Sequence, residues 1–219
     1  MLKEASESGT LNEDLHKQLE ALGYMGGYET ATVESGVSVL KADKLAEGLN
    51  LVVSAHGPEV YLMRSDGEVV HRWNCPRNKA FPDLARTKSD KKARSFRRAY
   101  VLPDRSLVGI YNGTGMVKLS SESEIIWTQP AMCHHDLCFS PDYKQIYTII
   151  QKRRLFPAIN KDEEVMDEEI TVLNAENGES LRQFSLLEAF HGSEYSPMLR
   201  KAPSSGDVLH ANTVRYVTE

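Results

Sequence analysis

The chain has few cysteines and no paired-cysteine motif. Its 219 residues include three cysteines, and no two of them are spaced as a CxxC pair. The odd number and the spacing argue against both a disulfide framework and a zinc knuckle. We therefore expect Cys75, Cys133 and Cys138 to be free thiols with a packing role.

The sequence also lacks long hydrophobic runs and an excess of positive charge. No apolar stretch approaches the roughly 20 residues of a membrane-spanning helix, and the polar residues 1–10 do not resemble a signal peptide. Lys and Arg number 26 against 31 Asp and Glu, a net charge of -5, which disfavours a nucleic-acid partner. Hydrophobic residues make up 41% of the chain, enough for one sizeable core or two small ones. We expect a folded protein without a membrane segment.

The chain has two parts with different sequence patterns. Residues 11–22 place leucines at helical spacing among polar residues, which predicts a short amphipathic helix followed by a linker to residue 35. From Val37 onward, short runs rich in Val, Ile, Leu, Tyr and Thr are separated by turn pairs such as Asp-Gly and Pro-Asp. This pattern predicts successive antiparallel hairpins. The expected organisation is an N-terminal helix and linker, residues 1–35, before an all-β domain, residues 36–219.

The β-rich part repeats itself. A polar turn is followed three times by a strand ending in an aromatic residue, at Trp73, Trp127 and Phe184, and the hairpins at Pro103 and Pro141 resemble each other. A repeat of roughly 40 to 55 residues holding four short strands is typical of a propeller blade. The predicted blades cover residues 36–73, 97–127 and 134–184, with one strand of a fourth from residue 207. A β-sandwich of ordinary hairpins is the alternative.

A partial β-propeller of about three blades leaves strand edges and apolar faces uncovered. We therefore expect further blades from a longer chain, or from another chain in an oligomer. Three stretches interrupt the repeat: 77–98, where nine residues are Lys or Arg, 153–169, which we predict to be a loop turning from basic to acidic, and 185–206, which begins with a short helical pattern. Long insertions of this kind are often lids or binding loops, and a solvated charged loop is the default for the basic one.

The repeat register brings three basic residues to equivalent places. Arg97, His135 and His210 each lie at the opening of a predicted blade. Because the first strand of a blade lines the central channel, we predict that these side chains converge. Successive strand residues face opposite sides, so we expect His135, rather than His134, to face the channel. Asp136 could orient an imidazole through its ring N–H.

Two histidines and an arginine facing one cavity suit an oxyanion. Arginine offers a rigid fork of donors to sulfate or phosphate oxygens, and neutral imidazole can act as a nucleophile or as a general acid and base. Asn212 would add a neutral donor, and His56 could also face the channel. In a competing account His135, His210 and Asp136 hold Zn²⁺ in a metal-dependent hydrolase. No HExxH or paired-cysteine spacing supports that account, so we rank it second and predict no metal or cofactor.

Several motifs resemble the amino-terminal part of bacterial arylsulfotransferase-like proteins. The order and spacing of the two histidine motifs make this resemblance more specific than either motif alone, and it covers most of the chain after about residue 36. The matching segments are 48–57, 61–63, 66–73, 97–99, 134–137, 185–189 and 206–214.

The resemblance implies a β-propeller enzyme, usually exported, that moves a sulfuryl group from an aryl sulfate to a phenolic acceptor without the nucleotide donor PAPS. Family members are thought to work through a sulfated histidine in ping-pong fashion, while other channel histidines and an arginine hold the sulfate. His135 and His210 match channel histidines of that set. The family has a further histidine motif in later blades, expected to hold the nucleophile, so the resemblance implies that these residues are a truncated piece of a longer enzyme. A noncatalytic propeller binding module is the alternative outside the enzymes.

Overall fold

The computed structural model describes residues 36–54, 57–83 and 95–218. The chain divides into two units, Met1–Leu40 and Lys41–Glu219. Residues 36–40, the described end of the first unit, form no helix or strand. The predicted helix at 11–22 lies outside the described residues.

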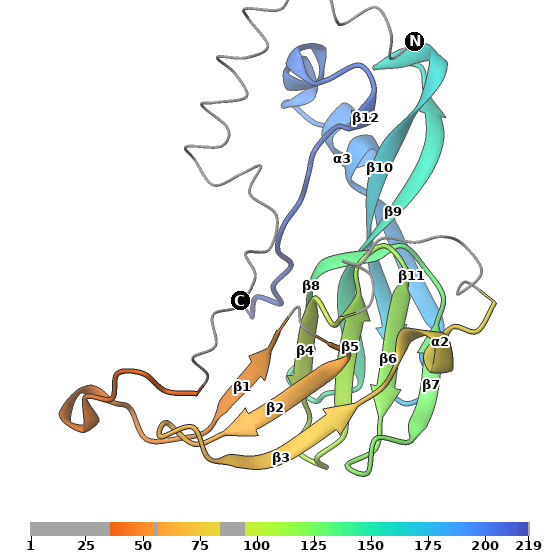
Figure 1. Cartoon of the computed structure of the whole chain (residues 1–219). Helices are drawn as coiled ribbons and strands as arrows, with labels where there is room; N and C mark the ends of the chain where they lie inside the picture. Colours follow the sequence, from red (N-terminus) through yellow and green to blue (C-terminus); the bar gives the residue numbers. More distant parts are fainter. Residues whose placement is uncertain (1–35, 55–56, 84–94, 219) are drawn as a thin grey trace, which may run out of the picture. The chain divides into compact units, whose positions relative to one another are not determined.

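The second unit is mostly β-structure in three antiparallel sheets, which confirms the all-β prediction (Figure 1). The first sheet contains β1 (Asn50–Val53), β2 (Glu59–Met63) and β3 (Val69–Asn74). The second contains β4 (Arg98–Val101), β5 (Leu107–Tyr111), β6 (Gly115–Leu119) and β7 (Ile125–Gln129). The third contains β8 (Cys133–Phe139), β9 (Gln145–Phe156), β10 (Asn160–Asn174) and β11 (Ser180–Ser185), and β12 (Gly206–Asp207) pairs in parallel with β10. None of these sheets closes on itself within the described part of the chain.

Short helical segments join the sheets. They are η1 (Ala42–Lys44), α2 (Arg77–Ala80), α3 (Leu186–His191) and η4 (Ser196–Lys201). The predicted helical pattern after Ser185 is α3, and the Ser185 side chain caps it by accepting a hydrogen bond from Glu188 N. None of the helices in the described ranges is long and apolar enough to cross a membrane.

Each sheet is a meander whose strands follow one another in chain order. Four of the hairpins share a turn in which a residue with a left-handed φ donates its backbone N–H to the carbonyl three residues earlier; these residues are Gly67, Arg105, Ser123 and Tyr143. In three of these turns an aspartate accepts a backbone hydrogen bond from the residue two positions on: Asp66, Asp104 and Asp142. The recurring Asp in the sequence is therefore a turn-forming residue. Each predicted blade range overlaps one sheet, but the first sheet has three described strands where four were expected, and β12, expected to open a fourth blade, pairs within the third sheet.

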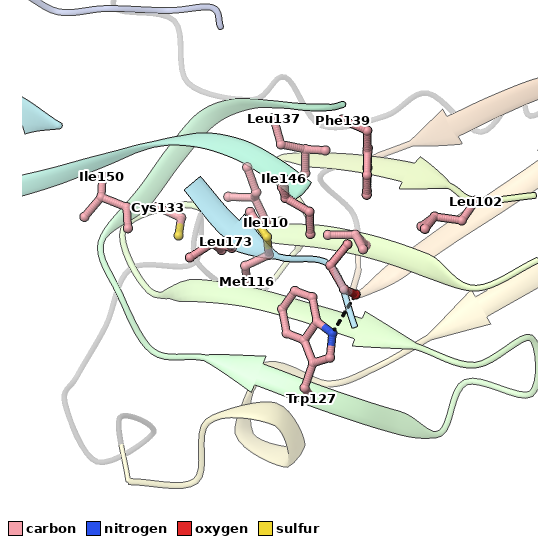
Figure 2. Close-up of a cluster of buried hydrophobic side chains, with 12 residues drawn as sticks. Leu102, Ile110, Met116, Trp127, Cys133, Leu137, Phe139, Ile146, Ile150 and Leu173 are labelled. Carbon is pink, nitrogen blue, oxygen red and sulfur yellow. Dashed lines mark hydrogen bonds between the residues drawn. The ribbon is translucent and has the colours of Figure 1, made fainter. Parts of the chain in front are cut away.

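The second sheet is buried on both faces. On one face Val108, Ile110 and Met116 pack against Ile146 and Leu173 of the third sheet (Figure 2). The indole N–H of Trp127, seen in the same view, donates a 3.3 Å hydrogen bond to the carbonyl of Ala175. On the other face side chains of β5 and β6 pack against the first sheet; this cluster includes Val60, Trp73, Leu107, Tyr111, Val117 and Leu119. The uninterrupted apolar run of β5 reflects this double burial.

The prediction of a loop at 153–169 is wrong. β9 and β10 run through it as a long two-stranded ribbon, with Arg154 paired to Val165 and Ile150 to Glu169. Part of this ribbon is exposed to solvent on both faces, so its residues do not alternate between apolar and polar. The sequence pattern of a strand is therefore absent there. A separate cluster around Phe156, Val165 and Leu187 packs α3 and η4 against the ribbon.

The expected first strand of a fourth blade is only the two-residue β12. Residues 208–218 form no strand. Buried carboxylates on β8 and β10 bind backbone N–H groups of this C-terminal segment, at Ala211 and Val214, in place of a neighbouring strand. The three cysteines are free, with Cys75 and Cys133 buried and Cys138 half-buried.

Candidate functional site

β8 bends at the predicted histidine doublet. It pairs with β9 up to His134 and again from Leu137, with a register shift between them. His135 and Asp136 lie in the resulting bulge, and His135 has a left-handed φ of 58°. Bulges of this kind re-aim side chains and are frequent beside functional sites.

The bulge brings both imidazoles of the doublet together. Nδ1 of His134 lies 2.5 Å from Nδ1 of His135, and the two rings meet edge to face with centroids 4.7 Å apart. His134 is buried, whereas His135 is half-buried. The expectation that the doublet would point to opposite sides applies to a regular strand, and the bulge brings the two rings into contact with His134 as the packed residue.

Glu168 lies behind His134. It projects from β10, and its Oε1 is 3.2 Å from His134 Nε2 in a contact that is almost completely buried. Its other oxygen, Oε2, accepts a 2.6 Å hydrogen bond from the backbone N–H of Ala211. Glu168 was not predicted as a site residue, although extending the alternation of Val172 and Ile170 back by two residues places it on the same face of a strand.

His210 reaches the same cluster from the C-terminal segment. Its ring centroid lies 5.4 Å from that of His135. Its backbone N–H donates to Asp207 Oδ1 at 3.1 Å, and its Nδ1 is 2.7 Å from Asp207 Oδ2. The side chain of Gln151 also donates to Asp207 Oδ2. Asp207 therefore favours a proton on Nδ1 of His210 and leaves Nε2 as the acceptor.

Arg97 lies immediately before β4 and is solvent-exposed. Its charge acts on His135, whose pKa is lowered first by burial and then by the charges of His134, Arg97 and His210. The Glu168 carboxylate acts in the opposite direction. Of the three residues predicted to converge, His135 and His210 are in ring contact, and Arg97 acts on His135 through its charge. The lowered pKa makes His135 a neutral imidazole near neutral pH.

Asp136 does not orient an imidazole. Its Oδ1 lies 3.1 Å from Nε of Arg98, and its Oδ2 accepts hydrogen bonds from Thr213 Oγ1, Val214 N and Arg215 Nη1. Burial tends to raise the pKa of Asp136, but the hydrogen bonds from Thr213 and Arg215 outweigh it and lower the pKa. The role predicted for Asp136 belongs to Glu168 and Asp207, because the bulge turns Asp136 toward the arginines.

The Asn212 side chain contacts the His210 backbone and not an imidazole of the cluster. It is exposed and donates to the backbone carbonyl of His210 at 2.9 Å. It therefore supports the His210 loop in this structure. His56 lies outside the described residues.

A cavity of about 370 Å³ lies beside Asp136, between β4, β8 and the C-terminal segment. Its lining is aromatic and cationic: Arg98, Tyr100, Leu137, Cys138, Phe139, Ser140, Pro141, Tyr143 and Arg215. A second cavity of about 460 Å³ lies at the hairpin turns between the second and third sheets, around Lys118 and Glu176. Neither cavity is lined by a histidine.

The described residues contain no group of three His, Cys, Asp or Glu side chains placed to hold a metal ion. Asp136, the carboxylate expected to complete a zinc site, is bound by two arginines instead. The donor set that this cluster presents is imidazole and guanidinium.

Comparison with known proteins finds no family model and no curated protein that matches the chain. The chemistry of the site is therefore argued from its geometry. Three imidazoles in contact, two of them backed by carboxylates, and a nearby guanidinium provide a neutral nucleophile, proton acceptors and a cation for an anionic group.

Proposed function

We propose that the chain is an arylsulfotransferase-like protein that transfers a sulfuryl group from an aryl sulfate to a phenolic acceptor through a histidine. The observation that carries the proposal is the contact between His134, His135 and His210, with the charge of Arg97 acting on His135. The resemblance of the same histidine motifs to that family supports it. We also propose that the three meanders are blades of a partial β-propeller, supported by their chain-order topology and common hairpin turn.

Sulfuryl transfer places few demands on a protein. The reaction needs positive charge near the sulfuryl oxygens, a nucleophile in line with the breaking S–O bond, and a proton for the departing oxygen. Arg97 offers a fork of N–H donors for the oxygens. The resemblance implies that the family's nucleophile lies in a further histidine motif, but among the described residues we assign this role to His135, which its lowered pKa leaves unprotonated.

His210 has the arrangement of a general base for the acceptor. With Asp207 holding Nδ1 at 2.7 Å, Nε2 can accept the proton of a phenol and return it to a leaving phenolate. Its exposed position allows an acceptor to approach.

The test is sulfuryl exchange from 4-nitrophenyl sulfate to phenol, followed by the absorbance of 4-nitrophenolate and by chromatography of phenyl sulfate. We expect exchange that falls by on the order of 10²-fold or more in His135→Ala and His210→Ala. His191→Ala, an exposed histidine on α3, is the matched control and should retain the parent rate. A folded protein without exchange would remove the enzyme proposal.

The second candidate is a noncatalytic binding module. It is favoured by one observation, that the cavities around Arg98 and Lys118 are lined by residues other than the histidines. In this case 4-nitrophenyl sulfate would bind without turnover, and His135→Ala and His210→Ala would leave its affinity unchanged. Isothermal titration of the three proteins separates this candidate from the transferase.

A further inference from the structure

The buried carboxylate of Glu168 contacts the buried imidazole of His134, which in turn contacts His135. We propose that Glu168 and His134 are positioning residues that hold the His135 proton on Nδ1, present its Nε2 as the nucleophile, and take up that proton during transfer. The inference deepens the proposed function and rests on it. His135 is the catalytic residue in this arrangement, and the other two act through it.

The distance between the two Nδ1 atoms constrains the protons. At 2.5 Å, one of the two nitrogens must carry a proton and the other a lone pair. Two lone pairs or two N–H groups at this separation would repel each other. When both rings are neutral, two arrangements satisfy this condition: His135 donates to His134, or His134 donates to His135.

Glu168 selects between these arrangements. Its Oε1 lies 3.2 Å from Nε2 of His134 in a contact that lacks hydrogen-bond alignment, and neither atom has a hydrogen-bond partner elsewhere among the described residues. The negative charge of this oxygen favours an N–H over a lone pair at Nε2. Neutral His134 then has its lone pair on Nδ1, so His135 is the donor. Nδ1 of His135 carries the proton, and Nε2 is free to attack.

The charges around His135 support the same direction of proton transfer. Arg97, before β4, and His210, on the C-terminal segment, both act against a positive charge on His135. Glu168, on β10, favours one, but it contacts the His134 ring directly and not the His135 ring. A positive charge formed in the cluster is therefore better placed on His134 than on His135.

The transfer step follows from this geometry. His135 Nε2 forms the N–S bond as the S–O bond to the aryl oxygen breaks, and the phenolate leaves with the bonding electrons. The Nδ1 proton of His135 passes to Nδ1 of His134. The products are a neutral imidazole ring bearing the sulfuryl group on His135 and an imidazolium on His134 that faces Glu168. In the second half-reaction His210 Nε2 takes the proton of the acceptor phenol as the phenol oxygen bonds to sulfur. The N–S bond breaks, the proton on His134 Nδ1 returns to His135 Nδ1, and the new aryl sulfate is released.

Glu168→Gln makes a sharp prediction, because the backbone N–H of Ala211 requires an oxygen at the Oε2 position. The amide NH₂ then faces His134 Nε2, which must become an acceptor. His134 Nδ1 becomes the donor, and the His135 lone pair moves from Nε2 to Nδ1. We expect both tautomers to invert, and the sulfuryl transfer rate to fall on the order of 10² to 10⁴-fold, as for other wrong-tautomer variants.

Long-range ¹H–¹⁵N spectra of the ¹⁵N-labelled chain report histidine tautomers without turnover, with the His135 signals assigned from His135→Asn. In the parent protein we expect the proton of His135 on Nδ1 and that of His134 on Nε2. This measurement needs no Glu168 variant, so it stays informative if Glu168→Gln does not fold. A proton on Nε2 of His135 in the parent protein would overturn the proposal.

Glu169→Gln is the matched control. Glu169 is the next residue on β10, faces the other side of the strand and binds Lys152 Nζ at 2.6 Å. It should leave both tautomers unchanged, whereas Glu168→Gln inverts them. Unchanged tautomers in a folded Glu168→Gln variant would contradict the positioning role of Glu168 and His134. Predicted tautomers in a protein without sulfuryl exchange would instead contradict the proposed function alone.

Discussion

At the scale of single residues, a left-handed backbone conformation distinguishes two histidines of the site, His135 and His210. Among the described residues, five that are not glycine have a positive φ: Arg105, Ser123, His135, Tyr143 and His210. Three of these close hairpin turns, where such a φ is part of the turn. The other two are the histidines of the site. A left-handed φ costs an L-residue on the order of 1 kcal/mol, and strain of this kind concentrates at functional positions.

The lowered pKa of His135 predicts a loss of stability at acid pH. In the unfolded chain His135 is protonated near the ordinary histidine pKa of 6.5, whereas in the folded protein it is protonated only at a lower pH. Its contribution is present above about pH 6.5 and is lost as the pH falls through its folded-state pKa. Urea unfolding at a series of pH values should show a shallower decline below neutrality in His135→Asn than in the parent, since Asn tolerates the left-handed φ.

His191→Asn is the control for the pH series. This residue is exposed on α3, and its replacement should leave the pH dependence unchanged. Identical slopes for the parent protein and for His135→Asn would mean that burial and the neighbouring charges do not lower the pKa of His135.

At the scale of the elements, four hairpins of the fold share one recurring turn. Leu102 N and Ser106 O pair across the turn between β4 and β5, and Arg105, at a φ of 66°, donates back to Leu102. Asp104 accepts hydrogen bonds from both the N–H and the hydroxyl of Ser106. The Pro-Asp pairs of the sequence supply this geometry, which explains why the hairpins are predictable from local residues.

Arg105→Gly should stabilise the protein by about 0.5 to 1 kcal/mol, because glycine adopts the left-handed φ without a steric penalty. Arg105→Ala keeps the penalty and should give no such gain. The free energy of unfolding in urea, measured for both variants, tests the turn. A gain of equal size in both would assign the effect to loss of the arginine side chain instead.

At the scale of the whole second unit, stability depends on packing between sheets. Trp127 in β7 inserts into the cluster shared by the second and third sheets and donates to the Ala175 carbonyl (Figure 2). Lys118, which is buried, donates to the same carbonyl at 3.1 Å. These contacts join two repeats that are separate in the sequence.

Trp127→Ala should destabilise the protein by about 3 to 5 kcal/mol, the cost of a large cavity in a packed core. Trp127→Phe keeps most of the volume and should cost less, since it removes mainly the hydrogen bond to Ala175. Denaturant unfolding followed by far-ultraviolet circular dichroism gives both values. Equal stability for Trp127→Ala and the parent would show that the two sheets do not share a core.

The sequence could predict those features that depend on local patterns. The repeat register aligned Arg97, His135 and His210, and the turn pairs marked the hairpins between neighbouring strands of one sheet. The bulge in β8 could not be predicted, because it arises from how His134 and Asp136 are bound by residues of β10, β4 and the C-terminal segment. Glu168 was missed for a related reason. The first half of its strand, β10, belongs to a solvent-exposed ribbon whose sequence resembles that of a loop. The arylsulfotransferase resemblance stays a prediction.

The most direct measurement is the mass of the intact protein, followed by peptide mapping at neutral pH, after brief mixing with 4-nitrophenyl sulfate. The account predicts one sulfuryl group per chain on the peptide containing His135, released by phenol and absent in His135→Ala. A parent protein that gains no sulfuryl group, or gains it on a residue outside the cluster of His134, His135 and His210, would contradict the account.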